Sequence, residues 1–240
     1  MGHPVTTLRR YPVKSMAGEG LAAAEVDPRG ITGDRWYAVV DADGRLASGK
    51  SSRRFRRRDE VFDHGALTTP SGVRVSCADG DWPVEDAALD RHLSEVMGAQ
   101  VRVMPEAAVQ HQDGGSISLV GTASLRWCEQ QLGVDADPRR LRVNLVFESD
   151  TPFIEEDWIR SVITAGSARL HVTERIERCR MIDLAQDGVA TTAGWLRSLA
   201  AERNMCLGVY ADVVVPGRIA VGDLVDGHDG ASARDARASS

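Results

Sequence analysis

Several common classes of protein are excluded by what this 240-residue sequence lacks. Its longest uninterrupted apolar run is Trp36–Val40, and a membrane helix needs about 18 or more apolar residues, so we expect no membrane contact. The first residues carry Arg9, Arg10 and Lys14 and have no apolar core, so we expect no secretory signal. A net charge of −6 gives no basic footprint, and we expect no nucleic-acid partner.

Cysteine is also scarce, which limits the metal and redox chemistry that the sequence predicts. The cysteines at 77, 128, 179 and 206 form no CxxC pair, and their spacing suits neither a zinc site nor a disulfide framework. We therefore expect reduced thiols and a cytoplasmic protein. The same scatter argues against a built-in iron–sulfur cluster, and no GxGxxG dinucleotide fingerprint is present. Redox catalysis would then need an external electron-transfer protein.

Short strand-like segments are what the sequence has in abundance. Asp43-Gly44 and Pro216-Gly217 are each typical of a turn between paired strands, and we predict a hairpin at each. Helical periodicity is limited to residues 85–97, 122–132 and 191–203. Many short strands with few helices predict a mainly β fold of the α+β class, with a barrel. The predicted strands are 36–41, 73–77, 101–104, 116–120, 144–147, 168–173, 209–215 and 218–225.

Two domains and a tail are expected along the chain. The segment 101–115, with its proline and paired glycines, is the predicted seam. We predict an N-terminal β-rich domain over 1–104 and a β-barrel domain over 105–226. The small, polar residues 227–240 predict a disordered tail.

One motif suggests a nucleotide instead. Gly44–Ser51 matches the phosphate loop of nucleotide hydrolases, which must follow a buried strand and open a helix. The following residues, 52–60, show no apolar stripe at helical spacing, and Gly44 equally suits a hairpin. We favour the hairpin and keep nucleotide binding as an alternative.

The segment Arg45–Arg58 carries seven basic residues and no acidic one in an acidic protein. It is either a solvated, mobile face or a collar that attracts an anionic ligand or an acidic redox partner. The sequence leaves both readings open.

Three further clusters suit the binding of an anion or a metal. Lys14 and Arg35 stand in two basic stretches near the N-terminus, and lysine and arginine are the residues that bind phosphate. Arg142 and Asn144 combine a second anion clamp with an amide. Cys179 lies between two arginines, whose positive charge favours the thiolate, a soft metal ligand; a lone cysteine is otherwise usually a small buried hydrophobe.

Taken in order, these segments resemble the MOSC family, named for the C-terminal domain of molybdenum cofactor sulfurases. The first two resemble the β-rich domain that precedes MOSC in larger members, and the others follow the MOSC pattern over nearly the whole chain. They are Tyr11–Ser15, Gly33–Trp36, Thr122–Leu125, Arg140–Asn144, Glu156–Trp158, Arg178-Cys179, Leu207–Tyr210 and Val221–Asp223.

The resemblance implies a fold, a cofactor and a set of site residues. The family is mainly β, and some members bind molybdopterin and reduce N-hydroxylated compounds. By position, the cofactor (Mo-molybdopterin) would be ligated at its metal by Cys179. Its phosphate would be held by Lys14, Ser15, Arg35 and Arg142, with Thr122 and Ser124 at the pterin. Asn144 and Arg178 complete the predicted cofactor-binding set.

We therefore predict a molybdenum-dependent oxidoreductase that reduces N-oxygenated small molecules. Two further hypotheses stay open: a sulfur carrier with a persulfide on Cys179, and a cofactor-binding module without catalysis.

Overall fold

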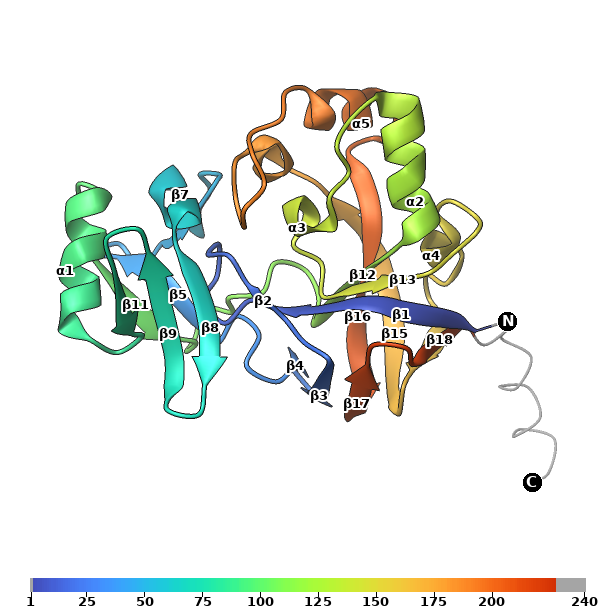
Figure 1. Ribbon diagram of the computed structural model, residues 1–240, viewed down its shortest axis with the longest axis horizontal. Coiled ribbons are helices and arrows are strands. Elements are labelled where there is room, and N and C mark those ends of the chain that lie inside the picture. Colours follow the sequence, from blue (N-terminus) through green and yellow to red (C-terminus); the bar gives the residue numbers. More distant parts are fainter. Residues whose placement is uncertain (1, 228–240) are drawn as a thin grey trace.

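The computed structural model describes residues 2–227, and the chain is mainly β with a few helices, as the sequence predicts (Figure 1). Except for Gly227, the predicted disordered tail lies outside the described residues. Among residues 2–227, no helix is long and apolar enough to cross a membrane.

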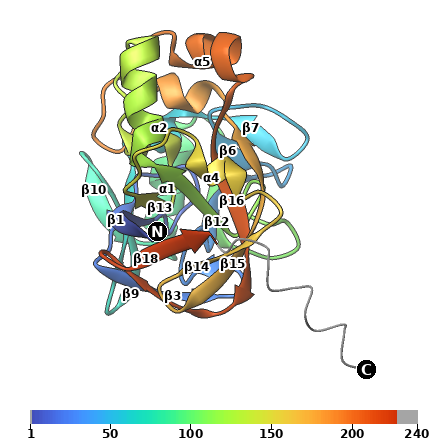
Figure 2. The same cartoon turned by 90° about the vertical axis from the view of Figure 1, so that its right-hand side faces the viewer.

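A closed barrel of seven strands forms one end of the molecule (Figures 1 and 2). All neighbouring strands are antiparallel except β12 and β13, and the pairing of β1 with β13 closes the ring. In order around the barrel they are β13 (Leu145–Phe147), β12 (Ile117–Gly121), β16 (Cys206–Val215), β15 (Ala168–Glu177), β14 (Val162–Ala165), β18 (Leu224–Gly227) and β1 (His3–Arg10).

Alternating side chains fill the barrel interior. Along β15, Ala168 and Leu170 are fully buried while Arg169 between them is exposed, the period-two pattern of a half-buried strand. Leu119, Leu145 and their neighbours on the other strands meet them in a single apolar core. A small sheet at one end joins β17 (Gly217–Ala220), β3 (Ala23–Asp27) and β4 (Gly30–Ile31), and β2 (Glu19–Gly20) pairs with the end of β1.

The N-terminal subdomain lies beside the barrel and has its own core (Figure 1). Helix α1 (Ala87–Val96) begins at Asp86, whose carboxylate accepts the Ala88 N–H, and it buries Leu89 and Leu93 one turn apart. Two sheets complete the subdomain. One sheet contains, in order, β11 (Val101–Pro105), β5 (Tyr37–Asp41), β6 (Leu46–Ser48) and β7 (Phe55–Arg57). The other contains β10 (Gly80–Pro83), β9 (Gly72–Cys77) and β8 (Gly65–Thr69). The short helix η1 (Asp59–Asp63) belongs to the same subdomain.

A helical layer covers the other end of the barrel, and a third apolar cluster around Trp195 and Leu199 lies beneath it. The predicted helix 122–132 is present, although its second half is a π-helical turn. The helices here are α2 (Thr122–Trp127), η2 (Cys128–Leu132), α3 (Pro138–Leu141), α4 (Ile154–Asp157), η3 (Arg180–Asp183) and α5 (Trp195–Arg203).

One of the two predicted hairpins is correct. Strands β5 and β6 pair antiparallel through a turn at Gly44, whose φ of 77° suits glycine, and no helix opens at Lys50, so the nucleotide-loop alternative is wrong. The second predicted hairpin, at Pro216-Gly217, is wrong, because β17 pairs with β3 and not with β16. A Pro-Gly turn redirects the chain, but it does not choose the partner strand.

Candidate functional site

A cavity between the N-terminal subdomain and the barrel is strongly electropositive. Six cationic side chains line it, against the two carboxylates of Asp113 and Glu177. This excess stands out in a protein whose net charge is −6. An enclosed, low-dielectric surface of one sign concentrates ligands of the opposite charge. The six cations are Lys14, Arg35, Lys50, Arg140, Arg142 and Arg178.

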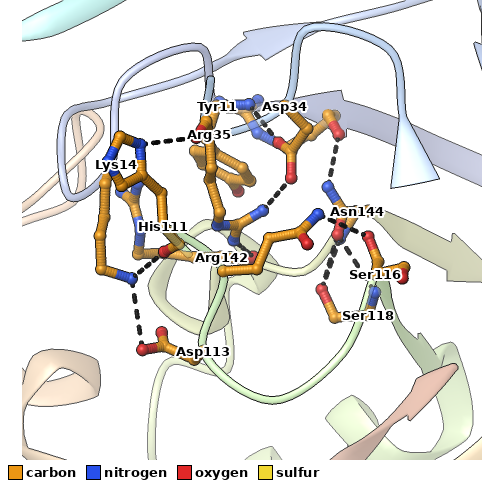
Figure 3. A network of polar contacts seen from close by, with 12 residues as sticks. Tyr11, Lys14, Asp34, Arg35, His111, Asp113, Ser116, Ser118, Arg142 and Asn144 are labelled. Carbon is orange, nitrogen blue, oxygen red and sulfur yellow. Dashed lines mark hydrogen bonds and ion pairs between the residues drawn. The ribbon is translucent and has the colours of Figure 1, made fainter. Parts of the chain in front are cut away.

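The two basic N-terminal stretches meet because their backbones are bonded together. The Tyr11 N–H donates to the Asp34 carboxylate at 2.8 Å, and the Arg35 N–H donates to the Tyr11 carbonyl at 2.7 Å. Arg35 also forms an ion pair with Asp34 and donates to the Arg142 carbonyl at 3.0 Å (Figure 3). The local fold thus brings Lys14 and Arg35 to one wall of the cavity.

The buried ring of Tyr11 packs against three guanidinium groups, two of which line the cavity. The guanidinium carbons of Arg142, Arg35 and Arg9 lie 4.4, 5.0 and 5.7 Å from the ring centroid. Cation–π contacts of this kind partly compensate for the desolvation of arginine. Burial raises the pKa of Tyr11 despite these cations, so the phenol stays neutral.

Arg142 is a buried cavity cation whose guanidinium group is only partly paired. Its helix α3 starts with Asp137, which accepts the Arg139 N–H at 2.9 Å, and ends at Arg142 in the left-handed conformation. One guanidinium nitrogen, Nη2, donates to the Met16 carbonyl at 2.7 Å, while the buried Nη1 has no hydrogen-bond partner. Burial lowers the pKa of Arg142 to about 10. An anion in the cavity would supply the missing acceptor.

Three residues of this wall have a strained backbone conformation. Ser15, Arg35 and Arg142 have φ values of 70°, 54° and 53°, a region that non-glycine residues seldom occupy. All three line the same cavity. Strained conformations of this kind persist where the fold holds a side chain in a required position.

Lys14 is held by the loop that follows the N-terminal subdomain. Its Nζ donates to the His111 carbonyl at 2.6 Å and to the Asp113 carboxylate at 3.2 Å (Figure 3). Burial lowers the pKa of Lys14 to about 8, although Asp113 opposes this. Burial disfavours the charged carboxylate of Asp113, but Lys14, Lys50 and Arg35 hold its pKa at about 2. Asp113 is thus the carboxylate that partly neutralises the cations of this wall.

Cys179 lies where the enclosed cavity opens to an outer groove. It lines both, and it immediately precedes helix η3. The two flanking arginines differ in their partners. Arg178 is buried and donates to the carbonyls of Leu141 and Leu207, whereas Arg180 forms an ion pair with Asp59. The half-buried Cys179 thus borders both the cationic cavity and the outer groove.

Three predicted cofactor-binding residues do not line the cavity. Thr122 and Ser124 bond to the loop 149–155: Thr122 accepts the Ser149 N–H at 3.0 Å, and Ser124 donates to Glu155 at 3.0 Å. Asn144 accepts the hydroxyl of Ser118 at 2.9 Å, a bond that ties β12 to the start of β13. We therefore assign these three side chains to structural roles and remove them from the proposed set.

Lys50 and Asp113 are cavity residues that the sequence reading missed. Lys50 belongs to the basic segment 45–58, which is itself a signal, but nothing local to Asp113 points to a site. Most arginines of that segment already have partners among the described residues. Arg56 pairs with Asp41 and Asp43, Arg57 with Asp59, and Arg58 with Asp41, while Arg54 donates to the carbonyls of Gln110 and Gln112.

Comparison with known families accounts for nearly the whole described chain. The MOSC N-terminal beta barrel domain matches residues 3–119, and the MOSC domain matches residues 106–226. The cavity lies between the parts covered by these two matches, and residues from both line it.

Individual relatives are distant. The chain is 24% identical to the molybdenum cofactor sulfurase of Danio rerio, over 86% of this chain and 31% of that protein. Identity to the molybdenum cofactor sulfurase of Anopheles gambiae is 29%, over 58% of this chain and 18% of that protein. The chain thus spans less than a third of either relative. The crystal structure of the YUAD protein from Bacillus subtilis has the same fold, with a TM-score of 0.51, 16% identity and 94% of each chain covered.

Proposed function

The chain belongs to the MOSC domain family, and from this we propose that it binds the molybdenum cofactor in the electropositive cavity. Lys14, Arg35 and Arg142 would hold the phosphate of the pterin, with Ser15 beside them and Lys50 at the cavity wall. The observation that carries the proposal is the buried Nη1 of Arg142, a charged donor without an acceptor. A phosphate offers several acceptor oxygens and matches the fork of a guanidinium.

Cys179 is the proposed protein ligand to the metal. A thiolate is a soft ligand suited to a sulfur-rich molybdenum centre, and Cys179 borders the same cavity as the phosphate-binding cations. When bound, the cofactor supplies the two-electron oxygen-atom chemistry, and the protein supplies position and charge. The outer groove beside Cys179 gives a small substrate access to that position.

We propose further that the reaction is the reduction of N-oxygenated small molecules. It would convert an N–OH group to N–H, releasing water and consuming two electrons and two protons. The electrons would come from a separate electron-transfer protein. The experiment that tests the cofactor assignment is elemental analysis of protein made in a molybdenum-replete host, together with pterin fluorescence after oxidative release. Protein without molybdenum or pterin would refute it.

A sulfur-carrier role is the second candidate, and the accessibility of Cys179 favours it. Cys179 borders the open groove, so a persulfide donor could reach it: the donor's outer sulfur would pass to the Cys179 thiolate, and the donor would leave as a thiolate. The curated relatives are named molybdenum cofactor sulfurases, which fits such chemistry. Metal-free protein that accumulates sulfane sulfur at Cys179 would decide for this role.

Cys179→Ser should abolish reduction while leaving the fold intact, because the change is nearly isosteric at a half-buried position. Pterin should still bind in part, since the phosphate-binding cations remain. The matched control is Cys206→Ser, a thiol on the same outer groove that does not line the enclosed cavity. X-ray absorption should lose one sulfur ligand in the first variant only; loss in both, or in neither, would contradict the ligand assignment.

Phosphate affinity should depend on the ionisation of Lys14. Its pKa is about 8, so the ammonium is present below about pH 8 and is lost as the pH rises through that value. We expect calorimetric titration with inorganic phosphate to give full affinity near neutral pH and weaker affinity above about pH 8. In Lys14→Arg the charge persists, because arginine titrates above about pH 12, and this fall should disappear. If the phosphate affinity of Lys14→Arg falls with pH as in the wild type, a group other than Lys14 causes the pH dependence.

A further inference from the structure

A second cluster of metal-ligating side chains lies in the N-terminal subdomain, and none of its members lines the electropositive cavity. The nitrogens of His64 and His92 and the sulfur of Cys77 all lie within 4.8 Å of one another. His64 follows η1, Cys77 ends β9, and His92 is on α1, so three separate segments converge there. Figure 1 shows α1 and β9 at the end of the molecule away from the barrel.

We propose that His64, Cys77 and His92 form a zinc site with an open fourth position for water. Bonds of about 2.0–2.1 Å to nitrogen and about 2.3 Å to sulfur in a tetrahedron put two nitrogens about 3.3 Å apart and nitrogen and sulfur about 3.5 Å apart. The Nε2 atoms of His64 and His92 are 3.1 Å apart, and Nε2 of His92 is 3.5 Å from the Cys77 sulfur. Two of the three edges are thus already spaced as in such a tetrahedron, and the ligand atoms of His64 and Cys77 lie within 4.8 Å of each other.

The surroundings of His64 prepare it for this role. Its Nδ1 lies 3.0 Å from the Glu60 carbonyl, a contact that requires the proton on Nδ1. Nε2 then presents its lone pair to the cluster. A backbone carbonyl on the second ring nitrogen is how zinc-binding histidines are commonly oriented. Since the imidazole is buried, its position is fixed before an ion arrives.

The other two ligands are also held in place. The Asp79 N–H donates to the Cys77 sulfur at 3.4 Å, which stabilises negative charge on that sulfur. The ring of His92 stacks on Trp82, with centroids 4.6 Å apart. A donor set of two imidazoles and one thiolate selects zinc and similar borderline ions over magnesium or calcium.

Such an ion would tie the η1 loop, the β9 strand and α1 together. Because it would bind the folded subdomain and not the unfolded chain, it would stabilise that subdomain by mass action. The spacing of 64, 77 and 92 follows none of the compact zinc motifs, so only the folded chain reveals the cluster.

Cobalt titration of the full chain, stripped of metal, tests the proposal. Co²⁺ should bind in a tetrahedral N₂S site, with visible bands and a sulfur-to-cobalt charge-transfer band, and Zn²⁺ should displace it. Cys77→Ser should remove the charge-transfer band, and His92→Gln should weaken Co²⁺ binding roughly tenfold or more. Cys206→Ser and His171→Gln are the matched controls and should leave the spectrum unchanged.

Absence of the bands in the wild-type chain would overturn the proposal, as would their persistence in Cys77→Ser. X-ray absorption of the zinc-loaded wild-type chain gives an independent answer if a variant fails to fold. We expect two imidazole nitrogens and one sulfur in the first shell. A shell of oxygen and nitrogen alone, or one with several sulfurs, would exclude the site.

Discussion

Arg142→Met should weaken the binding of phosphate-bearing ligands about tenfold to hundredfold, the loss expected for a hydrogen bond to a charged group. Arg142 is buried against Tyr11, and its Nη1 has no protein acceptor, so this nitrogen is available to donate to a ligand. The ligand-free protein should become more stable, by about 1 kcal/mol, because removing a buried cation ends its desolvation cost. Binding and stability therefore change in opposite directions.

Two measurements separate these effects. Calorimetry with inorganic phosphate and retention of pterin on purification report binding, and urea denaturation of the ligand-free protein reports the free energy of unfolding. Arg160→Met is the matched control, since Arg160 is also an arginine in the left-handed conformation but is exposed and away from the cavity. An Arg142 variant with weaker binding and an equal loss of stability would point to a purely structural arginine.

At pH values above neutral, Glu155→Gln should increase the free energy of unfolding by about 3 kcal/mol. Burial raises the pKa of Glu155 from 4.5 to about 7, and its Oε1 atom has no hydrogen-bond partner. The folded state therefore binds more protons than the unfolded state between about pH 4.5 and 7, so wild-type stability falls as the pH rises through this window. A shift of about 2.5 pKa units corresponds to about 3 kcal/mol.

The variant carries no charge at this position, so this contribution to the pH dependence disappears. Urea denaturation at about pH 5 and about pH 8 should show a smaller difference for the variant than for the wild type. Glu148→Gln, an exposed residue that directly follows strand β13, is the control and should behave as the wild type. If Glu155→Gln is destabilising at both pH values, the carboxylate is compensated by contacts that the neutral amide cannot replace.

The fold class follows from local sequence patterns, but the closure of the barrel does not. Alternation along 168–173 and the glycine turn at Gly44 report strands and a hairpin, since both depend on neighbouring residues. The pairing of β1 with β13 joins segments more than a hundred residues apart, and no local pattern encodes it. The wrong hairpin at Pro216-Gly217 has the same origin, because partner choice is decided by long-range packing.

The candidate site divides in the same way. Lys14, Arg35 and Arg142 come from motifs that the sequence reading recognises, and the folded chain brings them to one cavity. Thr122 and Asn144 are polar residues in equally recognisable motifs, but hydrogen bonds inside the fold occupy them. Sequence identifies a polar side chain, and only the structure shows whether its donors and acceptors are already satisfied.

The closure of the barrel by β1 also constrains how the protein is made. During synthesis the first ten residues emerge early, yet their partner strand β13 follows only after the entire N-terminal subdomain and helix α3. That subdomain has its own core and can fold while β1 is still without its partner strand. A chain cut near residue 105 would lose β1 and expose β13 and β18 as open edges. The segment matched by the MOSC domain is thus completed by a strand from the other end of the chain.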